Sequence, residues 1–212
     1  MTVNGKPDLK AGHTIKPDAI VVLAPGERYV SRGGDKLAGA LLDLNLSVSG
    51  VVGLDVGAST GGFTDCLLQN GATKVYAVDV GTHQLADSLR ADPRVVSMEQ
   101  THILDVQPAQ FEPLPSLAVI DASFISLKNI LAKVAELTAP GGTILAMVKP
   151  QFEVGSKHLK KGVVRDEAVR KQAVDDIIAF AQDLDFEYVS QAPARLKGPK
   201  GNQEYFVHLK KT

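Results

Sequence analysis

The chain has 212 residues, of which 44% are hydrophobic and 22% charged, and its formal net charge is −1. This length suits one α/β domain of ordinary size with a short additional segment. The sequence contains no apolar run near the roughly 20 residues that a membrane span needs, and its charge excludes a uniformly basic nucleic-acid-binding domain.

Residues 1–28 differ from the rest and are expected to form a small separate unit. Residues 3–6 alternate around an Asn-Gly turn signal, and residues 19–23 are predicted to form a second strand. The pattern V-N-G-K…K-x-G-x-x-I-x-x-D resembles the C-terminal end of an S4-type RNA-binding domain, without the two helices that normally precede it. This resemblance predicts that the chain starts inside such a domain. An ordinary N-terminal hairpin on the main domain is the alternative.

Pro25-Gly26 is the expected linker, and a helix is predicted to run through about Leu44. Its apolar residues recur at helical spacing, at Leu37, Ala40, Leu41 and Leu44. Lys36 lies at the start of this helix, where the helix dipole disfavours a cation. A solvated surface charge is the ordinary explanation for such a lysine, and a functional role is the alternative.

The rest of the chain is organised around the sequence L-D-V-G-A-S-T-G-G-F-T at residues 54–64. A strand at 51–54 leads into it and a helix at 63–69 leads out, the arrangement with which a parallel α/β sheet binds a nucleotide-like ligand. In the dinucleotide fingerprint G-x-G-x-x-G the second glycine admits a pyrophosphate, whereas Ser59 occupies that position here. Asp55 would repel a pyrophosphate but suits a ligand with an ammonium group and a sulfonium.

A second strand, 74–78, ends in Asp79, where a carboxylate can accept hydrogen bonds from both ribose hydroxyls. The two acidic strand ends and the glycine loop resemble those of S-adenosylmethionine-dependent methyltransferases. That resemblance implies S-adenosylmethionine as the cofactor. The expected cofactor-binding residues are Asp55, Gly57, Ser59, Gly61, Gly62, Phe63, Asp79, Thr101 and His102, with Asp105 as a rival for the adenine contact. An NAD-binding oxidoreductase and a glycine turn without a ligand are the alternatives.

Cys66 lies on the helix after this loop and is the only cysteine, so no intrachain disulfide can form, which fits a reducing cytoplasm. A lone cysteine here could be a nucleophile. A small buried side chain on a helix is the more common role, and it is the prediction made for Cys66.

Strands and helices alternate along the remaining chain. Further strands are expected at residues 94–97, 117–120, 143–148, 186–189 and 204–209, and further helices at 84–90, 127–137 and 166–183, the last capped by Asp166. This alternation predicts an α/β fold with a mostly parallel, seven-stranded, Rossmann-like sheet and helices on both faces. The resemblance described above makes it a class I methyltransferase fold.

Two basic segments interrupt the alternation. Residues 151–165 are predicted to form a long loop, and residues 195–202 form a second one. A long loop at the carboxyl edge of a sheet is often a lid or a binding loop, and a basic one favours phosphates. The candidate RNA-binding residues are Arg32, Lys157, Lys160, Lys161, Arg165, Lys197 and Lys200. Solvated charged loops are the alternative.

Four charged residues are the candidate catalytic group. Asp121 and Lys149 follow strands 117–120 and 143–148, at the carboxyl edge where such sheets bind ligands. Lys36 begins the helix before the sheet, and Glu204 opens the last strand. A buried lysine is rare unless paired, so a lysine directly after an apolar strand needs an explanation.

In chain order these residues form a Lys-Asp-Lys-Glu set, which resembles the tetrad of FtsJ-like RNA ribose 2′-O-methyltransferases. The local sequence is similar to one branch, the TlyA family. The resemblance covers nearly the whole chain. The segments that carry it are S-R-G-G-D-K-L, D-V-G-A-S-T-G-G-F-T-D, D-A-S-F-I-S-L, V-K-P-Q-F-E and K-G-V-V-R-D. Members of that family carry an S4 domain before the methyltransferase domain. The resemblance therefore implies that residues 1–28 are the C-terminal remnant of an S4-type domain with its linker, and that residues 29–212 are the methyltransferase domain.

The resemblance implies a cytoplasmic enzyme that transfers a methyl group to a ribose 2′-hydroxyl, of cytidine, in ribosomal RNA or ribosomal subunits. It assigns activation of the hydroxyl to Lys149, which must be neutral at the right moment or must orient the hydroxyl. Asp121 would position Lys149 and stabilise the approaching sulfonium methyl. Lys36 and Glu204 would complete the network and hold the ribose, and positioning should supply much of the rate.

The family is often labelled hemolysin A, so a membrane-lytic protein is one alternative, and a non-catalytic RNA-binding protein is another. Lysis needs an amphipathic or spanning apolar segment, and none is found that the α/β core does not use. The intact tetrad argues against a loss of catalysis. The five histidines show no ligand spacing and no Cys/His cluster exists, so no metal is expected, and oligomeric state is left open.

Overall fold

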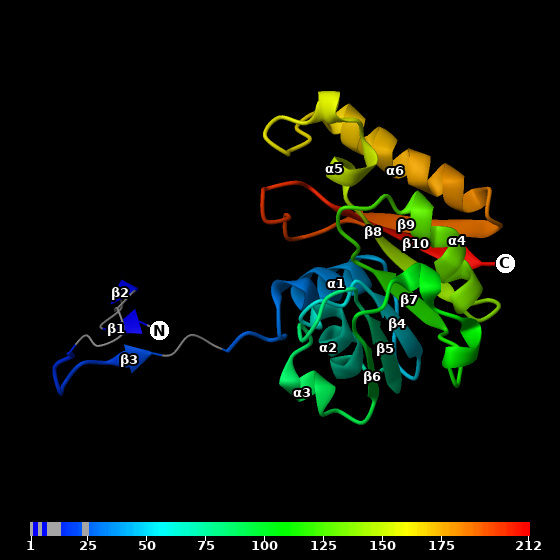
Figure 1. Cartoon of the computed structure of the whole chain (residues 1–212). Coiled ribbons are helices and arrows are strands. Elements are labelled where there is room, and N and C mark those ends of the chain that lie inside the picture. The colour runs from blue at the N-terminus through cyan, green and yellow to red at the C-terminus, as the bar shows by residue number, and fades with distance from the viewer. Residues whose placement is uncertain (1, 4–5, 8–13, 23–25) are drawn as a thin grey trace.

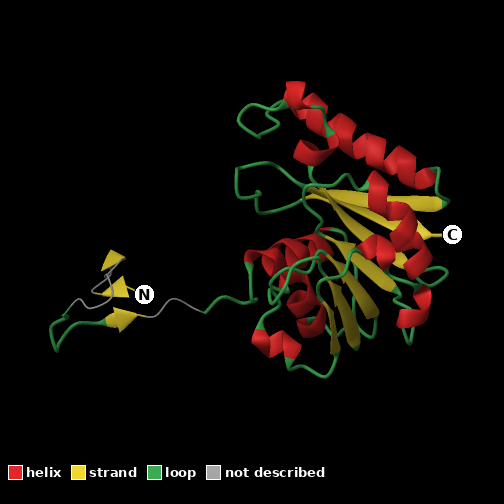
Figure 2. Ribbon diagram, in the orientation of Figure 1, coloured by secondary structure: helices red, strands yellow, loops and turns green. Residues whose placement is uncertain are grey.

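The computed structural model describes residues 2–3, 6–7, 14–22 and 26–212 of the chain. A seven-stranded sheet with helices against both faces makes up most of it (Figures 1 and 2). Its strands are β4 (Val52–Val56), β5 (Lys74–Val78), β6 (Val95–Met98), β7 (Leu117–Ile120), β8 (Thr143–Val148), β9 (Phe186–Pro193) and β10 (Tyr205–Lys211). The predicted α/β class and the predicted number of strands are confirmed.

The strand order across this sheet is β6-β5-β4-β7-β8-β10-β9. Strands β4 to β8 pair in parallel, whereas β10 runs antiparallel to both of its neighbours, β8 and β9. Tyr205 at the start of β10 is therefore in register with Val148 at the end of β8. Because of this reversal, the residue before β10 lies at the edge where the parallel strands end, which is the edge that binds ligands in such sheets.

Helices cover the two faces of the sheet in separate layers (Figure 1). The helices are α1 (Arg32–Asp43), α2 (Gly62–Gln69), α3 (Asp87–Arg90), α4 (Lys128–Leu137), α5 (Pro150–Glu153) and α6 (Glu167–Gln182). The side chains of α1, α2 and α3 pack into one core, and those of α4 and α6 pack into another on the opposite face. The central strands are buried on both faces, which explains why β7 and β8 are continuous apolar runs rather than alternating ones.

Side chains cap two helix starts, and one of these caps, Asp166, is predicted from the sequence. Asp166 caps α6, and its carboxylate accepts a hydrogen bond of 2.9 Å from the backbone N–H of Ala168. Ser31 caps α1, because its hydroxyl oxygen accepts a hydrogen bond of 3.3 Å from the backbone N–H of Gly33. The first turn of α1 is thereby held at the sheet edge, and it carries Lys36 with it.

Several predicted boundaries differ from the structure. The helix predicted at 84–90 is limited to α3, and residues 151–165 contain α5 and a 3₁₀ turn, η3 (Ser156–His158), so they are not one continuous loop. The other 3₁₀ turns are η1 (Ile103–Asp105) and η2 (Pro108–Gln110). Short-range periodicity does not register such brief helices, because one turn offers too few residues to show a repeat.

The N-terminal segment forms a small antiparallel sheet of its own, with the order β2-β1-β3. Its strands are β1 (Thr2–Val3), β2 (Lys6–Pro7) and β3 (Val21–Val22). Val3 pairs with Lys6, as the predicted hairpin requires, while the Asn4-Gly5 turn lies outside the described residues. The strand predicted at 19–23 is confirmed in its centre.

Candidate active site

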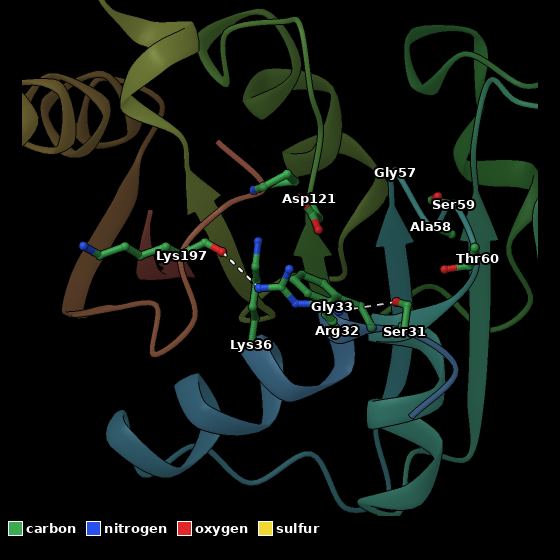
Figure 3. A pocket seen from close by; sticks show the side chains of 13 residues that line it. Ser31, Arg32, Gly33, Lys36, Gly57, Ala58, Ser59, Thr60, Asp121 and Lys197 are labelled. Atoms are coloured by element: carbon green, nitrogen blue, oxygen red, sulfur yellow. Dashed lines mark hydrogen bonds between the residues drawn. The ribbon is translucent and has the colours of Figure 1, made fainter. Parts of the chain in front are cut away.

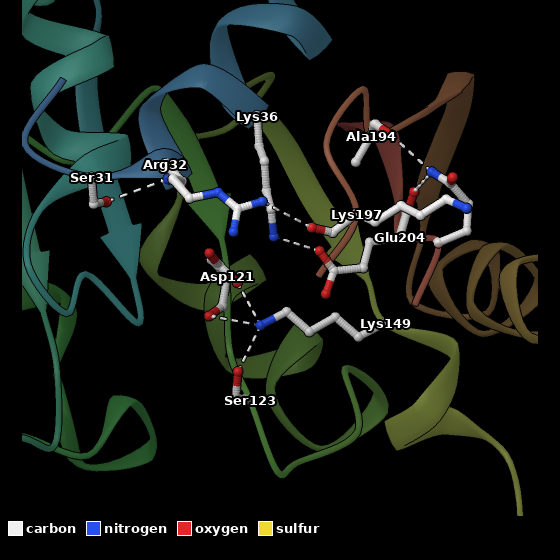
Figure 4. Close-up of polar contacts among 11 residues, drawn as sticks. Ser31, Arg32, Lys36, Asp121, Ser123, Lys149, Ala194, Lys197 and Glu204 are labelled. Atoms are coloured by element: carbon white, nitrogen blue, oxygen red, sulfur yellow. Dashed lines mark hydrogen bonds and ion pairs between the residues drawn. The ribbon is translucent and has the colours of Figure 1, made fainter. Parts of the chain in front are cut away.

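The fold brings the four candidate catalytic residues together from positions far apart in the sequence. Asp121 follows β7 and Lys149 follows β8, and these two strands are parallel neighbours. Glu204 precedes β10, whose reversed direction places it beside the end of β8. Lys36 comes from the first turns of α1, as Figure 4 shows. The predicted constellation is therefore a spatial cluster.

Two ion pairs organise this cluster (Figure 4). Lys149 Nζ lies 2.5 Å from Asp121 Oδ1, and Lys36 Nζ lies 2.5 Å from Glu204 Oε2. Lys149 also donates to the hydroxyl of Ser123 at 2.7 Å. Both lysines and Glu204 are buried, whereas the Asp121 side chain keeps 24% of its surface exposed. Each lysine is thus paired, which is the condition under which burial of a lysine is tolerated.

The Asp121 carboxylate is the group whose ionisation is most affected by this arrangement. Burial raises the pKa of Asp121, and the charges of Lys149 and Lys36 offset that rise only in part, while Glu204 adds to it. The negative charge of Asp121 therefore depends on the lysines that face it. Loss of either lysine would favour the protonated carboxyl and break the network on both sides.

Ser123 is a residue of this site that the sequence analysis did not single out. Its hydroxyl accepts the second hydrogen bond of Lys149 Nζ, so the amine is held from two sides of the segment after β7. The segment D-A-S-F-I-S-L was noted only as a family resemblance. The sequence signal for Ser123 is a hydroxyl two residues after Asp121, which follows a strand. Such pairs are common in loops, so the signal is weak.

Phe124 lies next in this segment and has an unusual conformation. Its φ is +65°, and 90% of its side chain is exposed. A bulky residue in the left-handed region is strained, so the surrounding contacts must hold it there. Its ring lies 5.1 Å from that of Phe152, measured between ring centroids, and Phe152 follows Lys149 in α5. The two segments that carry Asp121 and Lys149 are thus in contact through aromatic rings.

Glu153 at the end of α5 joins the same two segments by hydrogen bonds. One carboxylate oxygen accepts from the hydroxyl of Ser126 at 2.5 Å, and the other accepts from the backbone N–H of Leu127 at 2.9 Å. Leu127 is the N-cap residue of α4 and its side chain makes no capping hydrogen bond, so Glu153 supplies a carboxylate at that helix N-terminus. The segments after β7 and β8 are therefore fixed to each other four residues from Lys149.

A cavity of about 610 Å³ lies over the glycine loop and the ends of β4 and β5. Gly57, Ser59 and Asp79 line it, as predicted, and so do Thr101 and His102, whereas Asp105 does not. Asp79 accepts hydrogen bonds from the backbone N–H of Ser59 at 2.8 Å and of Gly81 at 2.7 Å. The lining residues that the prediction missed are Val56, Val78, Val80, Gln84, Ile103, Ala122, Ser123, Phe124, Ile125 and Ile130, with Asp121 at one end.

The three glycines of the loop serve different purposes. Gly57 has a φ of +86°, and a Cβ there would lie 2.9 Å from the Asp121 carbonyl oxygen. Gly61, with φ +94°, faces α3, because its Cβ would overlap the side chains of Leu85 and Leu89. Gly62 faces the first turn of α1 and lines a neighbouring cavity. Of the three, Gly57 borders the 610 Å³ cavity, whereas Gly61 lets the loop pack closely against Leu85 and Leu89.

Asp55 has a place different from the predicted one. The residue has no exposed surface and lines none of the cavities at this edge. Its Oδ2 accepts from the backbone N–H of Thr64 at 2.9 Å and from the Thr64 hydroxyl at 2.6 Å, while its Oδ1 is buried without a partner. The expectation that Asp55 lies against a bound ammonium is therefore corrected. The carboxylate lies behind the loop and holds the start of α2.

Burial sets the ionisation of this carboxyl group. It raises the pKa of Asp55 from an ordinary value of 3.8 to about 7, against the opposing hydrogen bond from the Thr64 hydroxyl. The nearby charges of Asp121 and Asp79 contribute to the rise. Asp55 is thus an acid inside the fold that titrates near neutral pH, directly below the loop that borders the cavity.

Two further cavities adjoin the first at Asp121, which lines all three. One of about 510 Å³ contains Lys149, Lys36 and Glu204, and one of about 340 Å³ lies between α1 and the glycine loop (Figure 3). Phe63 lines the smaller one and is otherwise buried against Phe206. The tetrad therefore lies where the glycine-loop cavity meets a second, more basic one.

The candidate RNA-binding residues divide into two groups. Arg32 and Lys197 line the smaller cavity, where Arg32 donates to the carbonyl of Lys197 at 3.4 Å, and Lys200 lines the 510 Å³ cavity. The others are exposed and do not line these cavities: Lys157, Lys160, Lys161 and Arg165. Leu159 and Gly162 of the same segment do line the 510 Å³ cavity. In the part of the chain that the structure describes, none of the seven forms an ion pair.

Cys66 is fully buried, as predicted, and burial raises the pKa of its thiol to about 11. A thiol with such a pKa is not an activated nucleophile. Within residues 2–3, 6–7, 14–22 and 26–212, no helix has the length and hydropathy to cross a bilayer. In the same ranges, no group of three or more His, Cys, Asp or Glu side chains could hold a metal ion.

Comparison with known proteins gives close relatives. The Bacillus subtilis protein YqxC is 47% identical over 184 residues, which are 86% of this chain but only 66% of YqxC. TlyA of Mycobacterium tuberculosis, named a 16S/23S rRNA (cytidine-2′-O)-methyltransferase, is 42% identical over 211 residues, 98% of this chain and 79% of TlyA. A Streptococcus thermophilus structure described as a hemolysin is 49% identical with a TM-score of 0.85, and the match covers 89% of this chain and 70% of that one.

More distant structures show the fold. A protein from Listeria monocytogenes described as an S-adenosylmethionine-dependent methyltransferase is 16% identical and has a TM-score of 0.58. The sheet is thus the Rossmann-like one of that class. The family model of the FtsJ-like methyltransferases matches residues 29–211, which include the tetrad and the glycine loop. The chain belongs to the FtsJ-like methyltransferase family.

Proposed function

We propose that this protein transfers a methyl group from S-adenosylmethionine to a ribose 2′-hydroxyl of ribosomal RNA, with cytidine as the target nucleoside. One observation carries the proposal. Lys149 Nζ is held by Asp121 and Ser123 at the point where the glycine-loop cavity meets the basic cavity. The rRNA (cytidine-2′-O)-methyltransferase name of the Mycobacterium tuberculosis relative supports the choice of substrate.

The residues around the 610 Å³ cavity fit the cofactor. The Asp79 oxygens each accept one backbone N–H and have free lone pairs on the cavity side, which suits two ribose hydroxyls. Thr101 and His102 lie beyond Asp79, beside Ile103, at the place for an adenine ring. Gly57 leaves open the space next to Asp121 that a Cβ would fill. Ser59, Gly62 and Phe63 would border the methionine part, and Asp55 would support the loop from behind through Thr64.

S-adenosylmethionine would supply an electrophilic methyl group on its sulfonium, and residues of the chain would orient the attacking hydroxyl and handle its proton. Lys149 Nζ contacts the attacking 2′-hydroxyl. If the amine is neutral it takes the hydroxyl proton, and if it is charged it orients the oxygen while the hydroxyl proton leaves to solvent. The oxygen forms the new bond to carbon as the carbon–sulfur bond breaks and its electron pair stays on sulfur. Asp121 and Ser123 hold the amine in line with this displacement, so positioning contributes a large part of the acceleration.

The second ion pair of the tetrad would hold the ribose from the other side. Lys36 Nζ and Glu204 Oε2 are buried against each other on the wall of the cavity that contains Lys149. The unshared oxygen of Glu204 and the remaining protons of the ammonium group are available to a sugar hydroxyl and a phosphate. We assign these two residues to substrate orientation, as the sequence analysis expects.

The surroundings of the tetrad suit an unpaired nucleotide. Phe124 presents an exposed ring at the boundary between the cavities, and single-stranded bases stack on such rings. The seven unpaired cations around the opening suit the phosphates of the flanking RNA. We also infer that residues 1–28 belong to an S4-type RNA-binding unit, with 29–212 as the methyltransferase domain. An rRNA substrate places the activity in the cytoplasm.

The test combines binding and turnover. Calorimetric titration with S-adenosylmethionine should give saturable binding, and a parallel titration with NAD should give none. Incubation with ribosomal subunits and S-adenosylmethionine labelled in its methyl group should then place the label on cytidine 2′-oxygens, mapped by resistance to alkaline cleavage. Binding of NAD alone, or label on bases rather than riboses, would contradict the proposal.

A further inference from the structure

Two basic loops border the cavity that contains Lys149, and they come from distant parts of the chain. The first basic loop is residues 157–165, between α5 and α6, and the second basic loop is residues 195–202, between β9 and β10. Both lie on the same side of the sheet in Figure 1, the first in yellow and the second in orange-red. Together they carry six of the seven candidate RNA-binding residues.

One buried side chain connects these loops. Asn202, at the end of the second basic loop, is only 3% exposed. Its Nδ2 donates to the carbonyl of Gly162 at 2.9 Å, and its Oδ1 accepts from the backbone N–H of Val164 at 3.0 Å. Both ends of the amide are therefore used on the first basic loop. The backbone carbonyl of Asn202 accepts a hydrogen bond of 3.0 Å from the backbone N–H of Gly198, and this bond closes the second basic loop.

The rest of the first basic loop is held at its base but not at its tip. Arg170 on α6 donates to the carbonyls of Val164 at 3.2 Å and Arg165 at 2.8 Å, which fixes the end of the loop to the helix. The tip is a narrow turn in which Lys160 and Val163 pair with each other. The side-chain hydrogen bonds that join the tip to the second basic loop are those of Asn202.

The connection brings the charges of the two loops together. A side chain at Gly162 would begin 3.6 Å from Lys200 Nζ, so the ammonium of the second loop lies against the backbone of the first. Lys160 and Lys161 flank that point and are exposed, as is Lys200. Like charges so placed repel one another, and a fixed backbone connection is what keeps them adjacent.

We propose that Asn202 is a positioning residue that joins the two basic loops into one RNA-binding wall. The proposal rests on the proposed function and adds to it how the surface that contacts RNA is held together. Asn202 acts through the loops: it presents their cations to a single stretch of RNA backbone. It lies two residues before Glu204, so the wall is also fixed relative to the tetrad. Without it the first basic loop would bind phosphates independently of the second.

The test replaces the amide and measures the salt dependence of RNA binding. Asn202→Leu removes both side-chain hydrogen bonds at similar size, and Asn202→Asp keeps the acceptor for Val164 but removes the donor to Gly162. Each phosphate contact on single-stranded RNA adds about 0.7 to the slope of log affinity against log salt. We expect Asn202→Leu to lower that slope by about 1 to 2 and to raise KM for RNA about tenfold. The effect of Asn202→Asp should be intermediate, with kcat changed less than about threefold.

Gln203→Leu is the matched control. Gln203 is the next residue and also uses its amide, but it donates to the carbonyls of Ala194 and Glu204, which lie at the two ends of the second basic loop and not on the first. This variant should keep the wild-type salt slope even if it melts earlier. Hydrogen exchange adds a local readout, because the Val164 amide should lose protection in Asn202→Leu while amides of β8 keep theirs.

The outcomes separate this inference from the proposed function. If the wild-type chain methylates RNA but Asn202→Leu keeps its salt slope and its KM, the positioning role is overturned and the function stands. If Gln203→Leu lowers the slope as much as Asn202→Leu, the effect is general loosening and the role is again overturned. If the wild-type chain neither binds nor methylates RNA, both ideas fail. If Asn202→Leu does not fold, the comparison of Asn202→Asp with Gln203→Leu decides.

Discussion

The two halves of the active site are built in different ways. The cofactor half rests on contacts between residues that are close in sequence, such as Thr64 with Asp55, nine residues apart, and Ser59 with Asp79, twenty apart. The catalytic half rests on contacts of long range, above all Lys36 with Glu204, which are 168 residues apart. The glycine-loop side of the first half lies within one strand–loop–helix–strand unit, and the segments after β6 and β7 complete its cavity. The second half exists only when β10 has joined the sheet.

This difference predicts that catalysis and cofactor binding can be separated by mutation, and Lys149→Ala should do so with the largest effect. In the proposed mechanism the amine contacts the attacking hydroxyl, and proton transfer of this kind contributes about 10²–10⁴-fold. We expect methyl transfer to fall by about that factor while the affinity for S-adenosylmethionine changes less than about threefold. The measurements are label incorporation into rRNA and calorimetric titration of the same preparation.

Lys171→Ala is the control for this experiment. Lys171 is exposed on α6 and forms only a surface ion pair with Asp175, so its removal should leave both quantities unchanged. Equal activity of Lys149→Ala and the wild type would remove Lys149 from the mechanism. A parallel loss of cofactor binding would show that the two halves are not independent.

The complementary variant, Asp79→Ala, should affect the cofactor half first. The change removes a carboxylate that lines the cavity and also frees the backbone N–H of Ser59 and Gly81. A hydrogen bond to a charged group contributes about 1.5–3 kcal/mol, so affinity for S-adenosylmethionine should fall about 10- to 100-fold. With saturating cofactor the turnover rate should recover to within a few-fold of wild type. Unchanged affinity would place the ribose elsewhere.

The sequence predicts the cofactor half better than the catalytic half for a physical reason. Strand, glycine loop and acidic strand end follow one another in the chain, so Gly57, Ser59 and Asp79 could be placed from local pattern. The direction of each side chain could not be predicted in this way. Asp55 lies at the expected position in the chain, but its side chain points into the protein, where it accepts a hydrogen bond from Thr64. Local spacing places a backbone position and does not determine which way a buried side chain points.

The tetrad was accessible only through a family resemblance, because no local pattern connects Lys36 with Glu204. Asp121 and Lys149 could be placed at one edge by topology alone, since both end parallel strands. Ser123, Glu153 and Asn202 were missed, because each has its role through a partner that is 26 to 40 residues away. Such pairings depend on loop conformations that neither periodicity nor propensity encodes.

The third prediction concerns the acid beneath the cofactor loop. Because burial raises the pKa of Asp55 from 3.8 to about 7, the folded protein holds a proton there that the unfolded chain has lost between these pH values. Folding stability therefore falls as pH rises from about 4 to about 7, by up to about 1.4 kcal/mol per unit from this group, and the effect ends above about 7. Urea unfolding at pH 5, 6, 7 and 8 measures it.

Asp55→Asn isolates this contribution. The amide oxygen can still accept from Thr64, but the residue no longer titrates, so the stability of the variant should fall less between pH 5 and 7 than that of the wild type. Thr64→Val offers a contrast, because it removes the hydroxyl hydrogen bond that favours the charged form, and so should extend the falling range to higher pH. Identical pH profiles for the wild type and Asp55→Asn would mean that Asp55 stays ionised in the fold.

The smallest expected effect tests the boundary between the two halves, where the segment after β7 contributes to both. Glu153 fixes that segment through Ser126 and Leu127, so Glu153→Ala should lower the free energy of unfolding by about 1–3 kcal/mol and slow methyl transfer several-fold. Ser126→Ala should have a weaker effect of the same kind. A double-mutant cycle should give a coupling energy of about 1 kcal/mol in stability.

The same cycle should also be run on the rate of methyl transfer at saturating cofactor and RNA. If Glu153 matters to catalysis by holding Asp121 and Ser123 against Lys149, the two changes couple in the rate as well as in stability. If the rates of the two variants simply multiply, Glu153 stabilises α4 and nothing more, and the Lys149 site is held by its own ion pair. Coupling in the rate would show that the long-range half of the site owes its geometry to the loops around it as well as to the sheet.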